Sequence, residues 1–165
     1  PDRKGGRGAD RQRVFEVMGH QIQAVIGKRE AIQVFADCWV QARVVDLPQD
    51  CALVYLTDAL FDDITELFDE PDRELPSPLA LFTSAIRWAL EGAARPGPLA
   101  YIETDYAGGV GTQAGVLLER GKVVLGPVEG EGTVNRLLNA IGVWHRPGED
   151  EFDALGLGRY RHMPL

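Results

Sequence analysis

Hydrophobic and polar positions change period several times along the chain, and each change marks a new element. Every second residue is apolar over 20–27, which predicts a half-buried strand. Over 28–39 the apolar residues recur at helical spacing instead, so a helix is expected to lie across that strand. Two β-rich runs follow, 42–47 and 52–56, and the three residues between them are too few for a parallel crossover. These two strands are therefore predicted to be antiparallel neighbours.

The middle of the chain predicts two helices of different character. Residues 59–69 carry an apolar stripe at helical spacing, and their opposite face is densely acidic, which indicates a surface helix. Ser77 can cap a second helix over 78–91, and Gly92 is a natural stop. Apolar residues go almost round this second helix. It is therefore predicted to be the central buried helix.

The C-terminal half predicts three more strands and two short helices. The strands are expected at 99–106, 113–120 and 122–127, and the helices at 134–141 and 149–155. This order is neither a regular alternation of strands and helices nor an internal repeat. It favours an α+β fold in a single domain, with a mainly antiparallel sheet of five or six strands and helices packed on one face.

Length and composition agree with one ordinary core. The chain has 165 residues, of which 45% are hydrophobic, so neither disulfides nor a metal is needed to hold it together. Residues 1–13 are basic and almost without apolar side chains, which predicts a flexible tail before a single globular domain over 14–165. Cys38 and Cys51 have no metal-ligand spacing, and Cys38 is expected to be a small buried hydrophobe.

Charge excludes several classes of partner. The net charge is −8, which disfavours general affinity for nucleic acid or for an anionic membrane surface. The sequence has no apolar run of membrane-spanning length and no signal-peptide core, so the simplest compartment is the cytoplasm, although a leader already removed would leave no trace. No cofactor or metal motif is recognised, and the oligomeric state is left open.

Acidic residues are concentrated in two places. Residues 58–74 hold eight acidic side chains against one basic side chain, and a second cluster spans 149–153. Neither supplies the ligand series of a calcium-binding EF-hand loop. A solvated face is the ordinary explanation, and the alternative is a basic protein partner. The candidate contacts for such a partner are Asp62, Asp63, Glu66, Asp69 and Glu70.

A glycine-rich segment, GGVGTQ at 108–113, contains three glycines, Gly108, Gly109 and Gly111, and ends at Gln113. With the next residue it matches one form of the dinucleotide-binding fingerprint, but a hairpin pattern follows where that site needs a helix. A connection between strands is therefore expected, with a loop shaped for a ligand or partner as the alternative.

Just before this segment, Glu103 and Asp105 share one face of a predicted strand. Paired carboxylates can act as general acid and base, and Thr112 could join them in a small hydrolase. Alternation of this kind is also how any solvent-exposed strand face looks.

Two strings, GGVGTQ and the C-terminal DEFDALGLGRYR at 150–161, resemble motifs of small uncharacterised bacterial proteins. The resemblance loosely covers residues 20–160 and implies no activity. Two hypotheses follow. One is a non-enzymatic protein-binding module, analogous in size and charge to an immunity or inhibitor protein. The other is the small hydrolase built on carboxylates beside the glycine-rich segment.

Overall fold

The computed structural model describes residues 20–107 and 110–160. The predicted basic tail at 1–13 lies outside the described residues, as do Gly108 and Gly109. No helix in these two ranges has both the length and the apolarity to cross a bilayer.

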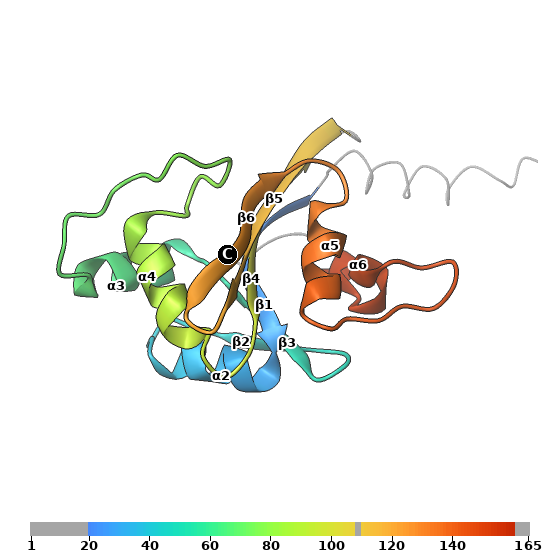
Figure 1. Ribbon diagram of the computed structural model, residues 1–165, viewed down its shortest axis with the longest axis horizontal. Helices are drawn as coiled ribbons and strands as arrows, with labels where there is room; N and C mark the ends of the chain where they lie inside the picture. The colour runs from blue at the N-terminus through green and yellow to red at the C-terminus, as the bar shows by residue number, and fades with distance from the viewer. Residues whose placement is uncertain (1–19, 108–109, 161–165) are drawn as a thin grey trace, which may run out of the picture.

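Six antiparallel strands form one sheet with the order β2-β3-β1-β4-β5-β6 (Figure 1). The strands are β1 (His20–Lys28), β2 (Val44–Leu47), β3 (Cys51–Tyr55), β4 (Leu99–Ala107), β5 (Val110–Glu119) and β6 (Lys122–Glu129). The predicted antiparallel pair of β2 and β3 is confirmed, and β5 and β6 are likewise antiparallel neighbours, joined by a tight turn. The α+β fold class is confirmed.

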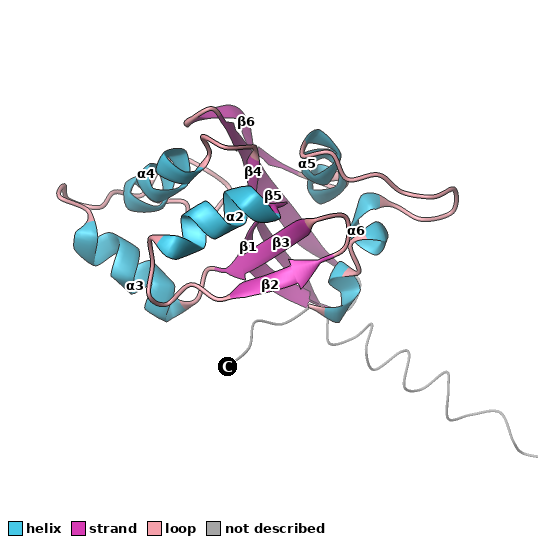
Figure 2. Ribbon diagram, turned by 90° about the horizontal axis from the view of Figure 1, so that it is seen from below, coloured by secondary structure: helices cyan, strands magenta, loops and turns pink. Residues whose placement is uncertain are grey.

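Helices cover both faces of the sheet rather than the single face predicted (Figures 1 and 2). On one face lie α2 (Arg29–Asp37), α3 (Asp58–Leu67) and α4 (Ser84–Ala93); on the other lie α5 (Thr133–Ala140), α6 (Glu151–Ala154) and the 3-10 turn η1 (Leu157–Arg159). The reason is visible in β3, where all five residues are buried. Successive strand residues point to opposite faces, so both faces need cover.

The alternation of the strands divides the core in two. Val54 and Tyr101 point toward α2, α3 and α4, whereas their neighbours Leu53 and Ile102 point toward α5 and α6. On the first face, α3 buries Leu60, and its N-terminus is capped by the hydroxyl of Thr57, which accepts from the N–H of Leu60.

The helix predicted after Ser77 begins later than expected. Ser77 does accept a hydrogen bond from the backbone N–H of Leu79, but the next two N–H groups donate to the carboxylate of Glu103 instead of entering a helix. Helix α4 starts only at Ser84, with Thr83 as its N-cap. A contact from a distant strand has therefore displaced the helix start.

Candidate functional site

The five predicted contact carboxylates lie on α3 and on the segment that follows it. Asp62, Asp63 and Glu66 belong to the helix, and Asp69 and Glu70 come after its end. Asp63 is half-buried and the other four are exposed. We call these five residues the acidic surface. Its position follows from the packing of α3, because Leu60 and Ile64 fill the inner side of the helix and leave the carboxylates outside.

No cationic side chain neutralises the acidic surface within the described part of the chain. The ion pairs there are formed by Arg29, Arg87 and His145, and each of them joins a carboxylate elsewhere in the molecule. Mutual repulsion among the five carboxylates is tolerated because water and salt screen exposed charges. Their charge is thus available to a partner.

An apolar groove of about 420 Å³ opens beside the acidic surface. It lies between the segment after α2 and the last turns of α3, and its lining is Cys38, Trp39, Val40, Gln41, Asp63, Glu66 and Leu67. Val40 is 84% exposed and Leu67 is 62% exposed. The sequence analysis missed this groove. Its local signal was an apolar Leu67 on an otherwise acidic helix face.

Trp39, which lines the groove, belongs to a chain of aromatic contacts. The ring of Trp88 on α4 lies 6.1 Å from that of Trp39 and 5.4 Å from that of Phe68. Trp88, which the pattern of its helix predicts to be buried, is 44% exposed. Cys38 is also exposed, contrary to expectation, because as the C-cap of α2 it lies on the outward side of the helix, where its thiol donates to the carbonyl oxygen of the exposed Val34.

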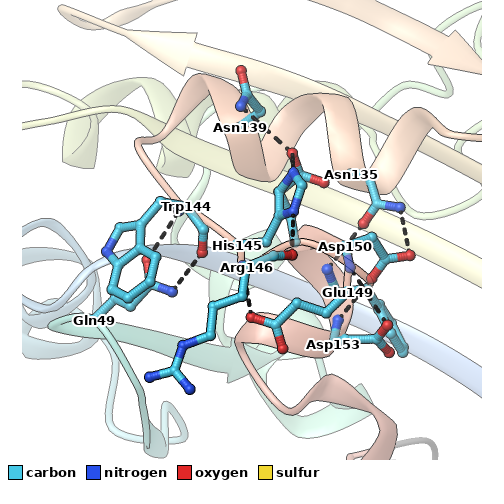
Figure 3. Close-up of polar contacts among 11 residues, drawn as sticks. Gln49, Asn135, Asn139, Trp144, His145, Arg146, Glu149, Asp150 and Asp153 are labelled. Carbon is cyan, nitrogen blue, oxygen red and sulfur yellow. Dashed lines mark hydrogen bonds and ion pairs between the residues drawn. The ribbon is translucent and has the colours of Figure 1, made fainter.

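The second acidic cluster is used within the fold (Figure 3). Asp150 and Asp153 form a reciprocal capping box at the start of α6, and Glu149 accepts a hydrogen bond of 2.9 Å from a backbone N–H three residues earlier. Glu151 is buried, and its carboxylate lies 3.6 Å from Nε2 of His145. These carboxylates hold the C-terminal segment together, unlike those of the acidic surface.

The loop before α6 is held by hydrogen bonds from Gln49 and from within the loop itself (Figure 3). Gln49 pairs with the backbone of Trp144, donating through Nε2 to its carbonyl at 2.8 Å and accepting from its N–H at 3.0 Å. The backbone carbonyl of Arg146 raises the pKa of His145, with smaller contributions from Glu151 and its neighbours and with burial opposing.

The carboxylates of the hydrolase hypothesis are differently placed. Glu103 accepts hydrogen bonds from the N–H groups of Ala80 and Leu81 and from the hydroxyl of Tyr101. Burial raises the pKa of Tyr101 well above its usual value, and the adjacent Glu103 raises it further. Glu103 therefore has a structural task.

Asp105 and Thr112 are brought together, since they are directly paired across β4 and β5, and both are exposed. Neither the groove nor the pocket described next is lined by Glu103, Asp105 or Thr112.

Two residues expected in the glycine-rich loop, Gly111 and Gln113, lie in strand β5. The backbone of Gly111 is outside the left-handed region, but a Cβ there would collide with the backbone oxygen of Asp105 and come within 2.6 Å of Tyr106. Close approach of two strands therefore requires this glycine. Gln113 accepts from the N–H of Val134 at 2.8 Å, which ties β5 to the start of α5.

A small polar pocket of about 180 Å³ lies on this α5 side of the sheet. It is lined by Thr104, Tyr106, Gln113, Val134, Asn135, Asp150 and Phe152. Gln113 also donates to the hydroxyl of Tyr106 at 2.9 Å, and Asn135 donates to Asp150 at 3.0 Å. These hydrogen bonds join side chains of the pocket to one another.

Metal-binding geometry is not found in the ranges 20–107 and 110–160, where no three histidine, cysteine or acidic side chains gather as a metal ion would require. Cys38 and Cys51 are both free thiols, and burial raises the pKa of Cys51. No family model, no curated protein and no solved structure matches the chain.

Proposed function

We propose that the protein is a non-enzymatic protein-binding module, comparable to an immunity or inhibitor protein, and that its acidic surface contacts a basic protein. One observation carries this proposal. The carboxylates of the acidic surface have no cationic partner in the described residues, whereas those of the second cluster cap a helix or accept local hydrogen bonds.

Electrostatic complementarity gives such a surface its use. A field of one sign accelerates encounter with a partner of the opposite sign and orients it on arrival. The acidic surface can be exposed at little cost to the fold because α3 turns its apolar side to the core. The two free thiols are compatible with a cytoplasmic protein, which we include in the proposal.

The test is affinity capture followed by binding measurements on the purified pair. The immobilised protein is exposed to a lysate of its native cell, captured proteins are identified by mass spectrometry, and the best candidate is purified. The test variant combines Asp63→Lys with Glu66→Lys. A matched control combines Glu129→Lys with Glu131→Lys, which changes the charge equally at exposed positions outside the acidic surface.

We expect a basic partner whose affinity falls by about tenfold or more in the test variant, the size of a lost complementary charge pair, and changes little in the control. An acidic partner would contradict the proposal. Equal losses in both variants would also contradict it, because the effect would then come from net charge alone.

A further inference from the structure

We propose that the groove beside the acidic surface receives the apolar side chains of a basic amphipathic helix. The inference rests on the proposed function, since the helix would belong to the basic partner. It assigns the partner's local structure and sequence pattern, which charge alone does not.

Exposure of apolar side chains in the groove is the first argument. Val40 and Leu67 both line it, and they are 84% and 62% exposed. Two such residues, together with Trp39, which also lines the groove and belongs to the core, form the apolar centre that protein interfaces typically have. The fold leaves Val40 and Leu67 exposed to water, and binding of a partner would bury them.

The groove is also preorganised. Trp39 is 8% exposed and belongs to the core on this face of the sheet, so the floor is fixed to the interior. Trp88 contacts the rings of Trp39 and Phe68 and thereby ties α4 to the ends of the chain segments that carry α2 and α3. A rigid floor lowers the entropy cost of ordering on binding.

The charge around the groove indicates which side chains should flank the apolar side chains of the partner helix. Asp63 and Glu66 line it, and no lysine or arginine does. Arg43 follows the groove-lining residues 38–41 in the sequence, but its guanidinium donates to the backbone carbonyls of Val40 and Ala42. An apolar floor with carboxylates on one border is complementary to an apolar side chain flanked by cationic ones.

The borders of the groove favour a helix as the occupant. One border is α3, on which Asp63, Glu66 and Leu67 share a face at helical spacing, and the other is the short segment 38–41 that follows α2. An amphipathic helix docks in a groove of this kind by laying its apolar side chains along it. The expected partner sequence has leucine-like residues at i, i+3 and i+4 with lysine or arginine on both sides.

The test uses two synthetic peptides of identical composition, each built from leucine and lysine. In one, the leucines form a single helical stripe; in the other, the same residues are scrambled so that no stripe exists. Isothermal titration calorimetry measures binding of both to the wild type, to Val40→Ser with Leu67→Ser, and to a control, Val124→Ser. Val124 is 46% exposed on β6 and outside the groove.

We expect the striped peptide to bind about tenfold more tightly than the scrambled one, as burial of one or two apolar side chains implies. The double serine variant should lose that difference, and Val124→Ser should keep it. Circular dichroism of each variant confirms that the fold is unchanged.

Each other outcome overturns the inference in a distinguishable way. If both peptides bound equally and Asp63→Lys with Glu66→Lys abolished that binding, the proposed function would stand. The inference that the groove receives a helix would be wrong. If neither peptide bound at low salt, the inference that the groove receives a basic helix would be wrong. The proposed function would then be tested by the affinity capture described above. Self-association of the wild type that the serine variants abolish would make a second copy of this chain the occupant.

Discussion

The carboxylate of Glu103 accepts three hydrogen bonds, at 2.6 Å from Ala80, 2.7 Å from Leu81 and 2.8 Å from the Tyr101 hydroxyl. Glu103→Gln replaces one accepting oxygen by an NH₂ group that faces these donors. We expect a loss of about 1.5–3 kcal/mol in the free energy of unfolding, the usual contribution of a hydrogen bond to a charged group. Denaturant titration measures it.

The control for Glu103→Gln is Asp105→Asn, an exposed position on the same strand face, which should change stability by about 0.5 kcal/mol or less. If Glu103→Gln cost no more than this control, the carboxylate would have no structural task. The hydrolase hypothesis would then regain its best candidate.

His145 gives the C-terminal segment a pH dependence. Its Nδ1 lies 3.1 Å from the carbonyl oxygen of Arg146 and its Nε2 lies 3.6 Å from Glu151. Both neighbours only accept hydrogen bonds, so they favour the protonated ring with its two N–H groups. Accordingly the pKa of His145 is raised above its ordinary value of 6.5.

A raised pKa in the folded state fixes the sign of the effect. The stabilisation is complete below the unfolded pKa and is lost as the pH rises through the folded pKa. We expect an NMR titration of the His145 ring to give a pKa above the unfolded value. In His145→Asn, the part of the stability that this ring loses as the pH rises above its ordinary pKa of 6.5 should vanish. An unshifted ring pKa would contradict the assignment.

At the scale of elements, α3 and α4 differ in how far the sequence predicts them. The cap, the apolar stripe and the acidic face of α3 are all local, and its range is predicted within two residues. The start of α4 depends on Glu103, a residue of β4 that lies far along the chain. Rules based on neighbouring residues cannot predict a contact between residues so far apart in the sequence. The apolar run that forms β3 is a signal for cover on both faces, but the sequence analysis did not use it and predicted cover on one face.

The core role predicted for α4 can be tested at Ile86, which is 1% exposed between the sheet and its neighbouring helices. Ile86→Ala should lower the free energy of unfolding by about 2–5 kcal/mol, because the lost methyl groups leave a cavity in a packed core. The adjacent Arg87→Ala is the control, since that side chain is exposed and its ion pair with Glu91 is worth little. Equal effects of the two substitutions by denaturant titration would place Ile86 outside the core.

At the scale of the whole molecule, the two acidic clusters lie on opposite faces of the sheet, one at α3 and the other at α6 (Figure 1). The sequence predicts both clusters equally well. It does not distinguish them, because only the fold shows that the second cluster caps α6 and accepts local hydrogen bonds, whereas in the described residues no ion pair or side-chain hydrogen bond uses the five carboxylates of the acidic surface. The groove was equally hidden, since it requires the segment at 38–41 to meet the end of α3.

This difference between the clusters leads to a kinetic prediction for the complex with the captured partner. Exposed charges act at long range, so the acidic surface should govern the association rate more than the dissociation rate. The wild-type association rate should fall as salt rises, because counterions screen the attraction over about 10 Å at 0.1 M ionic strength. Asp63→Lys with Glu66→Lys should associate more slowly and depend less on salt, with folding nearly unchanged because neither side chain belongs to the core. Surface-binding kinetics over a salt series measure the association and dissociation rates, and calorimetry measures the thermal stability of each protein. If wild type and variant associated at the same rate at every salt concentration, the carboxylates of α3 would be an ordinary solvated helix face.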